Sequence, residues 1–399
     1  MKKLMLLGGI RYLIPLIETA HEHGVYVITA DYLPNNFAHK YSDEYCNVNI
    51  IDKDAVLRQA ENLNIDGIMS FACDPGVDTA AFVADKMGLP SVGPYKSVHI
   101  LQNKGLFRNF LCSNGFNVPA FQSYTNIALA LEDYDRFHWP VIVKPTDSAG
   151  SKGVTKVITP DGLKKAIEYS LHFSHCGQFI IEDFLQQKGE ASDSDSFSVD
   201  GKLEFVSFNR QFFDKTAVNP YTPAAFSWPT SISCEHQKEL TNEIQRLITL
   251  LHMGTSIYNI ETRECTDGKT YIMECSPRGG GNRLAECIRY ATGVDMITGA
   301  MKAALGEEME GITQKSITGN WAEVILHGRK KGRLKEVTVD PEIRNYLIDS
   351  NLWVKEGDNI DEFTGADKTI GTLIFNFSSI NQRENVLKNI DEYVKVQLL

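Results

Sequence analysis

The chain is organised around the sequence IYNIETRECTDGKTYIMECSPRGGGNR, residues Ile257–Arg283. Its centre, Asp267-Gly268, is the dipeptide most typical of a two-residue hairpin turn, and it separates two strands of alternating residues. Such a turn opposes Glu261 to Glu274. Directly opposed Cβ atoms lie about 4.5–5.5 Å apart, so the two carboxylates could share one cation, and hard oxygen ligands suit Mg²⁺. The alternative for this pair taken alone is an exposed hairpin with both carboxylates in water.

The same register opposes Asn259 to Ser276. Residues two apart on a strand share a face, so we expect all four polar side chains to point the same way. Downstream, Arg278 adds a positive charge, and Gly279–Gly281 permit a tight backbone turn. The hairpin therefore presents a row of side chains with oxygen atoms, and the positively charged Arg278 follows this row in the sequence.

Composition narrows the class of protein. A length of 399 residues predicts two or three domains. The formal net charge of −11 argues against a general nucleic-acid binder. The 8 cysteines include no C-x-x-C pair, which indicates neither a disulfide framework nor a zinc site. No apolar run approaches the roughly 18 residues of a membrane span. We expect a cytoplasmic protein with neither nucleic-acid nor membrane partners.

The first 95 residues alternate strands with helices. Strands at 4–7, 25–30 and 67–71 predict βαβ units and a parallel sheet, with ligands at the carboxyl ends of the strands. Gly8-Gly9 hints at a dinucleotide fold, but the full G-x-G-x-x-G pattern is missing, which favours a loop that lines another site. Asp74, just past the third strand, favours an ordinary turn, with a substrate contact as the alternative. A helix from Ser97 to Asn114 carries Lys104.

A second candidate site follows the strand at 141–145, which contains Lys144. The next residues, Thr146–Gly153, are small and rich in Ser and Gly. Such a loop lets backbone N–H groups approach phosphate oxygens closely, while Lys144 supplies a compact positive charge. This is not a Walker A loop. The candidate phosphate contacts in the loop are Ser148, Gly150, Ser151 and Gly153.

Three further segments follow. The expected strand Gln178–Ile181 is followed by Glu182 and Leu185, and Glu190 comes soon after. The polar run Ser192–Ser196 favours a solvated segment over a role in a site. The run Asn219–Trp228, with several Pro and aromatic residues, fits either a wall of a substrate pocket or a packed loop.

Four of these segments carry a resemblance when they are taken in order. Lys104, VIVKPTDSAGSKGV (141–154), FIIEDFL…GE (179–190) and YNIETRECTDGKTYIMECSPRGGG (258–281) resemble the ATP-grasp superfamily over about residues 95–300. The resemblance implies a fold that combines α/β and α+β parts. Its expected domains are a parallel-sheet domain at 1–95, an ATP-grasp domain at 96–312 with a mobile lid at about 121–186, and a small C-terminal α+β domain at 313–399.

The resemblance also implies roles at the nucleotide. Lys104 and Lys144 would hold the α- and β-phosphates of ATP, with the 146–153 loop over the terminal phosphate. Glu182 would accept the adenine amino hydrogen, and the backbone near Leu185 would contact the ring. Glu190 would take the ribose hydroxyls. Carboxylates suit these positions because amino and hydroxyl groups are donors, whereas carboxylates beside phosphates would repel them.

At the metal, Glu261 and Glu274 would bind Mg²⁺ or Mn²⁺, and Arg278 would steady the transferring phosphoryl group. Members of the superfamily usually carry Asn two residues after the second metal Glu, but this chain has Ser276. A hydroxyl is a weaker ligand than an amide oxygen. Either Ser276 or the opposed Asn259 could therefore complete the metal site.

The implied activity is that of a ligase. A small carboxylate would attack the γ-phosphate of ATP to give an acyl phosphate, and an amine would displace phosphate to form an amide, with Lys144 and Arg278 as the catalytic cations. A homodimer is common among similar enzymes. Two alternatives stay open, which are a bicarbonate-activating enzyme of the carboxylase or carbamoyl-phosphate type and a non-catalytic nucleotide-binding module.

Overall fold

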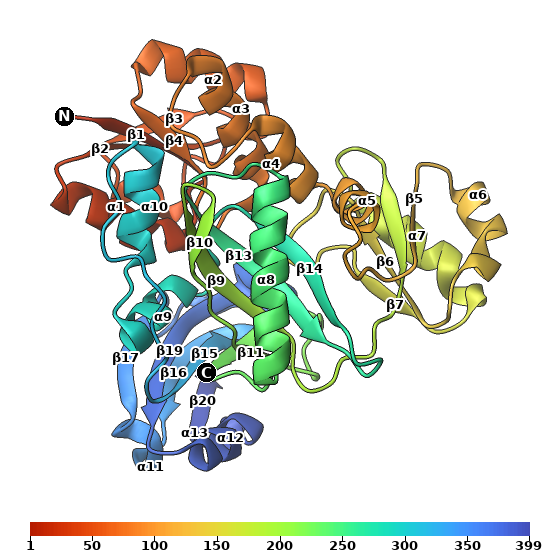
Figure 1. Cartoon of the computed structure of the whole chain (residues 1–399). Coiled ribbons are helices and arrows are strands. Elements are labelled where there is room, and N and C mark those ends of the chain that lie inside the picture. The colour runs from red at the N-terminus through yellow and green to blue at the C-terminus, as the bar shows by residue number, and fades with distance from the viewer.

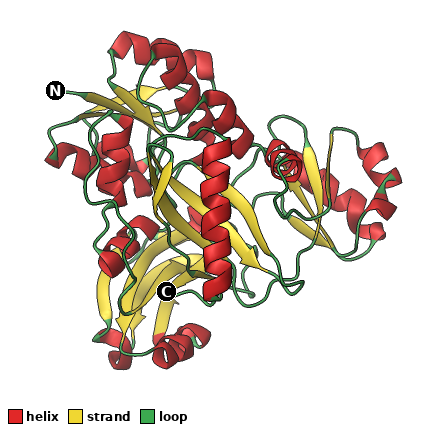
Figure 2. Ribbon diagram, viewed as in Figure 1, coloured by secondary structure: helices red, strands yellow, loops and turns green.

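The computed structural model describes all 399 residues and contains five β-sheets (Figures 1 and 2). The N-terminal sheet is parallel, in the order β3-β2-β1-β4, which confirms the predicted parallel sheet. Strand β1 is apolar because helices cover both faces of the sheet, and Leu4–Leu7 are fully buried. The elements are β1 Lys3–Leu7, α1 Ile14–Glu22, β2 Tyr26–Asp31, β3 Glu44–Asn47, α2 Lys53–Leu63, β4 Gly67–Met69 and α3 Val77–Met87.

The helix expected from Ser97 to Asn114 is two helices, α4 Tyr95–Gln102 and α5 Lys104–Ser113. Asn103 separates them because its backbone is extended and its side chain caps α5, accepting from the N–H of Leu106. Lys104 is thus the first residue of α5. Its backbone N–H donates to the carbonyl oxygen of Thr146 at 2.9 Å, which fixes this helix end against the candidate phosphate loop.

A second sheet, in the order β5-β8-β6-β7, is antiparallel and has its own core. Val141, Val143, Phe179 and Ile181 alternate inward on its strands and pack against α7. This subdomain projects to the right of the rest of the molecule in Figure 1. Its elements are β5 Phe121–Tyr124, α6 Ile127–Glu132, β6 Val141–Pro145, β7 Thr155–Val157, α7 Leu163–His172 and β8 Phe179–Asp183.

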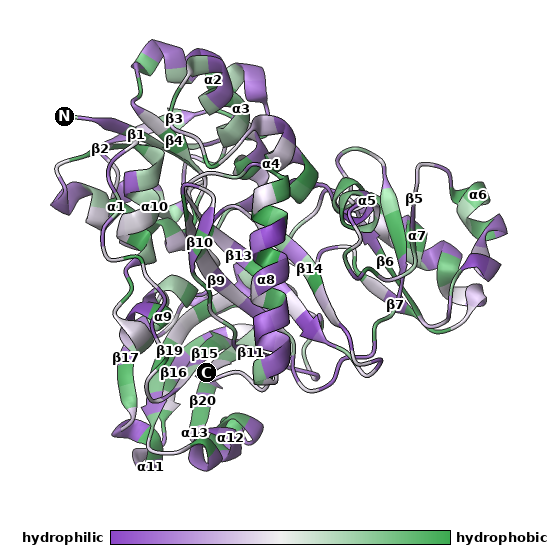
Figure 3. Cartoon of the chain, in the orientation of Figure 1, coloured by the Kyte–Doolittle hydropathy of each residue, from purple (hydrophilic) through white to green (hydrophobic).

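The central sheet is antiparallel, in the order β10-β9-β13-β14. Helix α8 covers one face with Leu240, Ile244 and Leu247, which pack against Tyr258 and Ile260 of β13. Figure 3 shows hydrophobic and hydrophilic patches along α8. The other face of the sheet carries the polar row predicted from the hairpin. The elements are β9 Ser192–Val199, β10 Lys202–Phe205, α8 Cys234–Leu250, β13 Ser256–Glu264, β14 Thr270–Ser276, α9 Leu284–Thr292 and α10 Met296–Ala304.

The C-terminal part has a five-stranded sheet, β11-β12-β15-β19-β17, and a three-stranded one, β18-β16-β20. Two strands of the larger sheet precede residue 313, so the boundary expected there does not coincide with the edge of a sheet. The elements are β11 Arg210–Phe213, β12 Pro223–Trp228, β15 Asn320–His327, β16 Gly332–Val339, α11 Pro341–Arg344, β17 Leu347–Leu352, β18 Asn359–Ile360, β19 Thr369–Phe377, α12 Ile380–Lys388, α13 Ile390–Tyr393 and β20 Val394–Leu398.

The Asn219–Trp228 run, for which the sequence left a pocket wall and a packed loop as alternatives, ends in strand β12. Trp228 is fully buried, and Phe226 lies in the same core, so packing against β15 extends these residues. No helix of the chain is both long enough and apolar enough to cross a membrane.

Candidate active site

The hairpin brings its polar residues together in the predicted register. On β13 and β14, Glu261 pairs with Glu274, and Asn259 pairs with Ser276. Exposure follows the predicted face, because the side chain of Glu274 is 48% exposed while its neighbour Cys275 is buried. The pairing of the two glutamates is therefore a structural fact, whereas their role as metal ligands stays a prediction.

The turn itself differs from the predicted two-residue form. The N–H of Cys265 donates to the carbonyl of Lys269, so three residues, Thr266–Gly268, form the connection. Gly268 has a φ of 78°, which favours glycine. A β-bulge between Glu261 and Thr262 then shifts the pairing by one residue. The longer turn and the bulge offset each other, which is why the register at the carboxylates is the predicted one.

Each carboxylate of the pair has its own cation. Arg263 Nη2 contacts Glu261 Oε1 at 2.8 Å, and Lys104 Nζ contacts Glu274 Oε1 at 3.1 Å. Lys104 Nζ also donates to the carbonyl oxygen of Ser148 at 2.9 Å, in the candidate phosphate loop. These contacts offset the repulsion between two opposed acids. They also show that Lys104 contacts both Glu274, a predicted metal ligand, and Ser148, a predicted phosphate contact.

The hydroxyl of Ser276 is already engaged. It donates to Asp74 Oδ1 at 3.0 Å and accepts from Gln102 Nε2 at 2.9 Å. The Asn259 amide donates its Nδ2 hydrogen to Asp195 at 3.2 Å. This hydrogen bond orients the amide of Asn259 without using its oxygen atom. The geometry therefore favours Asn259 over Ser276 as the residue whose oxygen could bind the metal.

Asp74, for which the sequence favoured an ordinary turn, lies in the site. Its carboxylate receives Arg278 Nε at 2.8 Å and Arg278 Nη2 at 2.6 Å, a bidentate pair that joins the N-terminal sheet to the hairpin. Burial would raise the pKa of Asp74, but the charge of Arg278 outweighs it and the pKa is lowered. Arg278 thus meets the site with its charge already compensated.

Glu182 points toward Lys144, one of the two lysines predicted to bind phosphate. Its buried carboxylate contacts Arg108 Nε and Lys144 Nζ, each at 2.7 Å. Burial alone would raise the pKa of Glu182, but Arg108 and Lys144 lower it to about 2. The pKa of Lys144 is lowered because burial outweighs the attraction of Glu182. Glu182 and Lys144 therefore form one ion-paired unit, and the contact of Glu182 with adenine stays a prediction.

The candidate phosphate loop has two glycines in the left-handed region and a hydrogen bond to a distant segment. Gly150 and Gly153 have φ of 67° and 72°, in the left-handed region. Ser151 Oγ donates to the carbonyl oxygen of Tyr221 at 3.0 Å. The loop therefore lies against the segment that precedes β12, a contact that the sequence did not indicate.

Leu185 and Glu190 lie on the connection from β8 to β9. Leu185 packs against Tyr271 and Met273 of the hairpin. Glu190 pairs with Arg210 Nε at 2.9 Å and accepts from Ser231 at 3.3 Å. The structure does not bring Glu190 into contact with the other predicted nucleotide residues, and its role at the ribose stays a prediction.

The Ser192–Ser196 run, for which the sequence favoured a solvated segment, is strand β9 and is largely buried. Asp193 pairs with Glu261 and Asp195 with Asn259, so both acids extend the polar row. Burial, together with the charge of Glu261, raises the pKa of Asp193 to about 8. Burial raises the pKa of Asp195 to about 7.

Gly280 lies beside Asp195, at one end of the row of polar side chains. Its N–H donates to Asp195 Oδ1 at 2.8 Å. A Cβ at this position would lie 2.5 Å from Leu284 and 2.9 Å from both Asn259 Nδ2 and Asp195 Oδ1. Only glycine allows the backbone to approach the sheet this closely.

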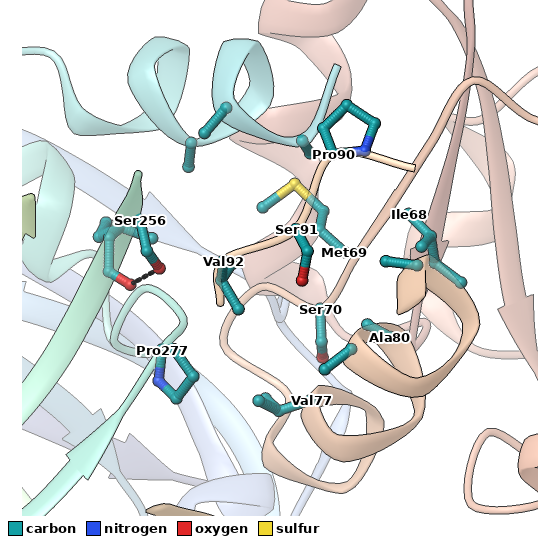
Figure 4. A pocket seen from close by; sticks show the side chains of 16 residues that line it. Ile68, Met69, Ser70, Val77, Ala80, Pro90, Ser91, Val92, Ser256 and Pro277 are labelled. Carbon is teal, nitrogen blue, oxygen red and sulfur yellow. Dashed lines mark hydrogen bonds between the residues drawn. The ribbon is translucent and has the colours of Figure 1, made fainter. Parts of the chain in front are cut away.

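An apolar cavity lies between the N-terminal sheet and β13 (Figure 4). Its volume of about 30 Å³ has room for a water molecule or two. Met69, Val77, Pro90 and Pro277 are among the side chains that line it, and none of the predicted site residues does. The cavity is therefore not the candidate site.

Sequence reasoning missed Arg108 and Arg263 and undervalued Asp74, Asp193 and Asp195. The alternation Ser-Asp-Ser-Asp-Ser could have indicated a strand with both acids on one face. The ion pairs of Arg108 and Asp74 join residues far apart in the chain. No local pattern reports such contacts.

Comparisons with known proteins found a matching domain family, related sequences and similar solved structures. The model of the ATP-grasp domain family matches residues 137–286. The carbamoyl phosphate synthase large chain of Thermotoga neapolitana is 25% identical over 215 residues, which is 54% of this chain. The chain spans only 19% of that relative's length.

Two solved structures are similar over nearly the whole chain. The L-amino acid ligase from Bacillus licheniformis has a TM-score of 0.82 and 19% identity, covering 100% of this chain and 99% of that one. The biotin carboxylase domain of the Hydrogenobacter thermophilus 2-oxoglutarate carboxylase has a TM-score of 0.76 and 13% identity, covering 99% of this chain and 90% of that one. It was solved as a dimer with MgADP, ADP and bicarbonate. The family match shows that the chain contains an ATP-grasp domain over residues 137–286, and the two solved structures share its overall fold.

Proposed function

We propose that the chain is an ATP-dependent ligase that activates a small carboxylate as an acyl phosphate and joins it to an amine, releasing ADP and phosphate. The observation that carries this proposal is the convergence of Glu261 and Glu274 with Lys104 and the 146–153 loop. Opposed acids beside a lysine and a glycine-rich loop suit a metal-bridged polyphosphate better than any other ligand.

The residues fit a magnesium ion that arrives with the nucleotide. Glu261 and Glu274 would supply its protein oxygens, and the remaining positions would belong to phosphate and water, as is common for Mg²⁺. Magnesium would neutralise charge on the phosphates during transfer. No three His, Cys, Asp or Glu side chains converge closely enough to bind a metal by themselves, which agrees with a metal held partly by its nucleotide.

The remaining work falls to this chain's own cations and loops. Lys104 and Lys144 would hold the phosphates while the substrate carboxylate attacks the γ-phosphate, giving ADP and an acyl phosphate. The amine then attacks the acyl carbon, phosphate leaves, and the amine loses a proton. Arg278 would stabilise the developing charge, and the lid would exclude water, which would hydrolyse the acyl phosphate.

The proposal is tested by measuring release of ADP and phosphate with ATP, Mg²⁺ and a panel of small carboxylates and amines. We expect Glu274→Gln and Lys144→Met to lower turnover at least a hundredfold. Glu168→Gln, an exposed glutamate on α7, is the matched control. Wild-type turnover in either site variant would contradict the assignment.

Bicarbonate is the second candidate for the acid. The similarity to a carbamoyl phosphate synthase and to a biotin carboxylase domain favours it. ADP release that needs bicarbonate and no other acid would support this candidate. Release that needs an organic carboxylate and continues in bicarbonate-free buffer would support the ligase.

A further inference from the structure

The carboxylate of Asp74 accepts three hydrogen bonds from the end of the hairpin. Arg278 donates to it through Nε at 2.8 Å and through Nη2 at 2.6 Å, and the hydroxyl of Ser276 donates at 3.0 Å. Gln102, the last residue of α4, donates through Nε2 to the Ser276 hydroxyl at 2.9 Å. Side chains from three separate segments of the chain therefore form one network around one carboxylate.

The backbone around Asp74 is docked on the hairpin. Asp74 opens a 3₁₀ turn, and just before it the N–H of Ala72 donates to the carbonyl oxygen of Gly279 at 3.1 Å. A Cβ at Gly279 would lie 2.4 Å from the ring of Phe71, so only glycine lets the two segments come this close. The N-terminal domain is therefore in direct contact with the segment that carries Arg278.

Asp74 fixes the direction of the Arg278 guanidinium. This group has five N–H donors in one plane. Two of them bind Asp74, and one, on Nη1, donates to the carbonyl oxygen of Gly279 at 2.9 Å. The other two make no hydrogen bond within the chain. Because a bidentate pair fixes the orientation of the plane, Asp74 decides where these two donors point.

The network also accounts for the serine at position 276. Members of the ATP-grasp superfamily usually carry Asn there. A hydroxyl can donate and accept through one atom, and here that atom lies between Asp74 and Gln102. Ser276 is only 8% exposed, so little of it remains open to a ligand. The serine thus supports Asp74 and, through it, Arg278.

We propose that Asp74, supported by Ser276, is the positioning residue for Arg278, so that the N-terminal domain presets the direction in which this cation meets the reacting oxygens. This inference rests on the proposed function, in which Arg278 stabilises the developing charge. Donors that are oriented before the reaction stabilise the transition state without a cost of reorganisation. The side-chain hydrogen bonds of Asp74 all go to Arg278 and Ser276, so loss of Asp74 should slow turnover and leave ATP binding nearly unchanged.

The first test uses Asp74→Asn, which keeps the size of the side chain and removes its charge. Turnover is measured as ADP release with ATP, Mg²⁺ and the acid and amine that the wild-type protein uses best. Binding of ATP is measured by calorimetry without the acid. We expect kcat to fall at least thirtyfold and the Kd of ATP to change less than threefold. Wild-type kcat in Asp74→Asn would overturn the inference.

Asp78→Asn is the matched control for this test. Asp78 lies in the same domain, is about as buried as Asp74, and forms an ion pair with Lys53 at 2.6 Å. It has no contact with Arg278, so its kcat should stay within threefold of wild type. An equal loss of kcat in Asp78→Asn and Asp74→Asn would show a general effect on the domain and would overturn the inference.

The second test is a double-mutant cycle with Arg278→Met. A residue that acts only through Arg278 has nothing left to position once the guanidinium is gone. In the Arg278→Met background, Asp74→Asn should therefore lower kcat less than threefold. An acid with a purely structural role would lower kcat by the same factor in both backgrounds, and that result would count against the positioning role.

Ser276→Ala keeps the inference testable if Asp74→Asn does not fold. It removes one of the three hydrogen bonds to Asp74 and no charge. We expect kcat to fall about three- to tenfold, with the Kd of ATP unchanged. Wild-type kcat in Ser276→Ala would then overturn the inference.

Absence of turnover with every acid and amine would contradict the proposed function instead. In that case NMR of the protein with ¹⁵N-labelled arginine tests the network separately. The Nε proton of Arg278 is assigned by its absence from Arg278→Met, and its exchange with water is measured. We expect exchange at least tenfold faster in Asp74→Asn than in wild type, because Nε loses its charged acceptor. Equal exchange rates would show that Asp74 does not hold Arg278.

Discussion

Replacing Glu182 by Gln distinguishes two roles for this residue. The resemblance assigns its carboxylate to the adenine amino group, whereas the structure places it between Arg108 and Lys144 at 2.7 Å from each. The side chains of Glu182 and Arg108 are 3% and 1% exposed. Glu182→Gln would therefore leave two buried cations without their shared anion, so we expect a large loss of stability.

Two separate considerations give the same magnitude. Breaking a buried ion pair by removing one partner costs about 3–5 kcal/mol. The pKa of Glu182 falls from its ordinary 4.5 to about 2, and at about 1.4 kcal/mol for each pH unit the ionised group contributes roughly 3 kcal/mol. This contribution is complete above the unfolded pKa of 4.5 and is lost as the pH falls toward 2.

The assay is urea unfolding of Glu182→Gln and wild type at pH 7, followed by thermal melting from pH 6 to pH 3. We expect Glu182→Gln to be about 3 kcal/mol less stable at pH 7, with the difference shrinking below pH 4. Glu168→Gln, which removes an exposed pair on α7, should cost less than about 1 kcal/mol. A Glu182→Gln protein as stable as wild type that loses its preference for ATP over GTP would refute the structural role and restore the adenine role.

Three further expectations follow from the same geometry. The pKa of Asp195 is raised to about 7, so its ionisation destabilises the fold as pH rises from about 4 to 7. Urea unfolding should therefore show Asp195→Asn to be more stable than wild type by a few kcal/mol at pH 8. At pH 4 the two proteins should be equally stable. Asp74→Asn should lower stability by about 2 kcal/mol, measured the same way, because it leaves the partly buried Arg278 unpaired. Removing Mg²⁺ with EDTA should weaken ATP binding at least tenfold by calorimetry, because Glu261 and Glu274 would otherwise repel the phosphates.

The parts of the site that were predictable are those set by local periodicity. The pairing of Glu261 with Glu274 could be predicted because alternation along two short strands fixes which residues share a face. The turn between them could not, since a three-residue connection and a bulge give the same final register. The extra residue in the turn and the β-bulge cancel each other. They do so because the buried face of the strands allows only one register at Glu261 and Glu274.

The partners of the site residues could not be predicted, because they come from distant segments. The sequence suggested an adenine contact for Glu182, which stays a prediction, and only the fold brings Arg108 of α5 against its carboxylate. Asp74 follows a strand of the N-terminal sheet, and nothing near it in the sequence points to Arg278. Charge compensation of this kind depends on how domains pack, which periodicity does not report.

These ion pairs bear on how the site would receive its nucleotide. Lys104 is paired with Glu274, and Glu261 with Arg263, so the candidate phosphate and metal groups are already neutralised within the chain. A bare polyphosphate would have to draw Lys104 away and leave Glu274 facing Glu261 uncompensated. A magnesium nucleotide can instead exchange partners, its phosphates taking the lysine while its metal takes the two acids. The charges then stay balanced at every step, which favours the metal and the nucleotide entering as one unit over either entering alone.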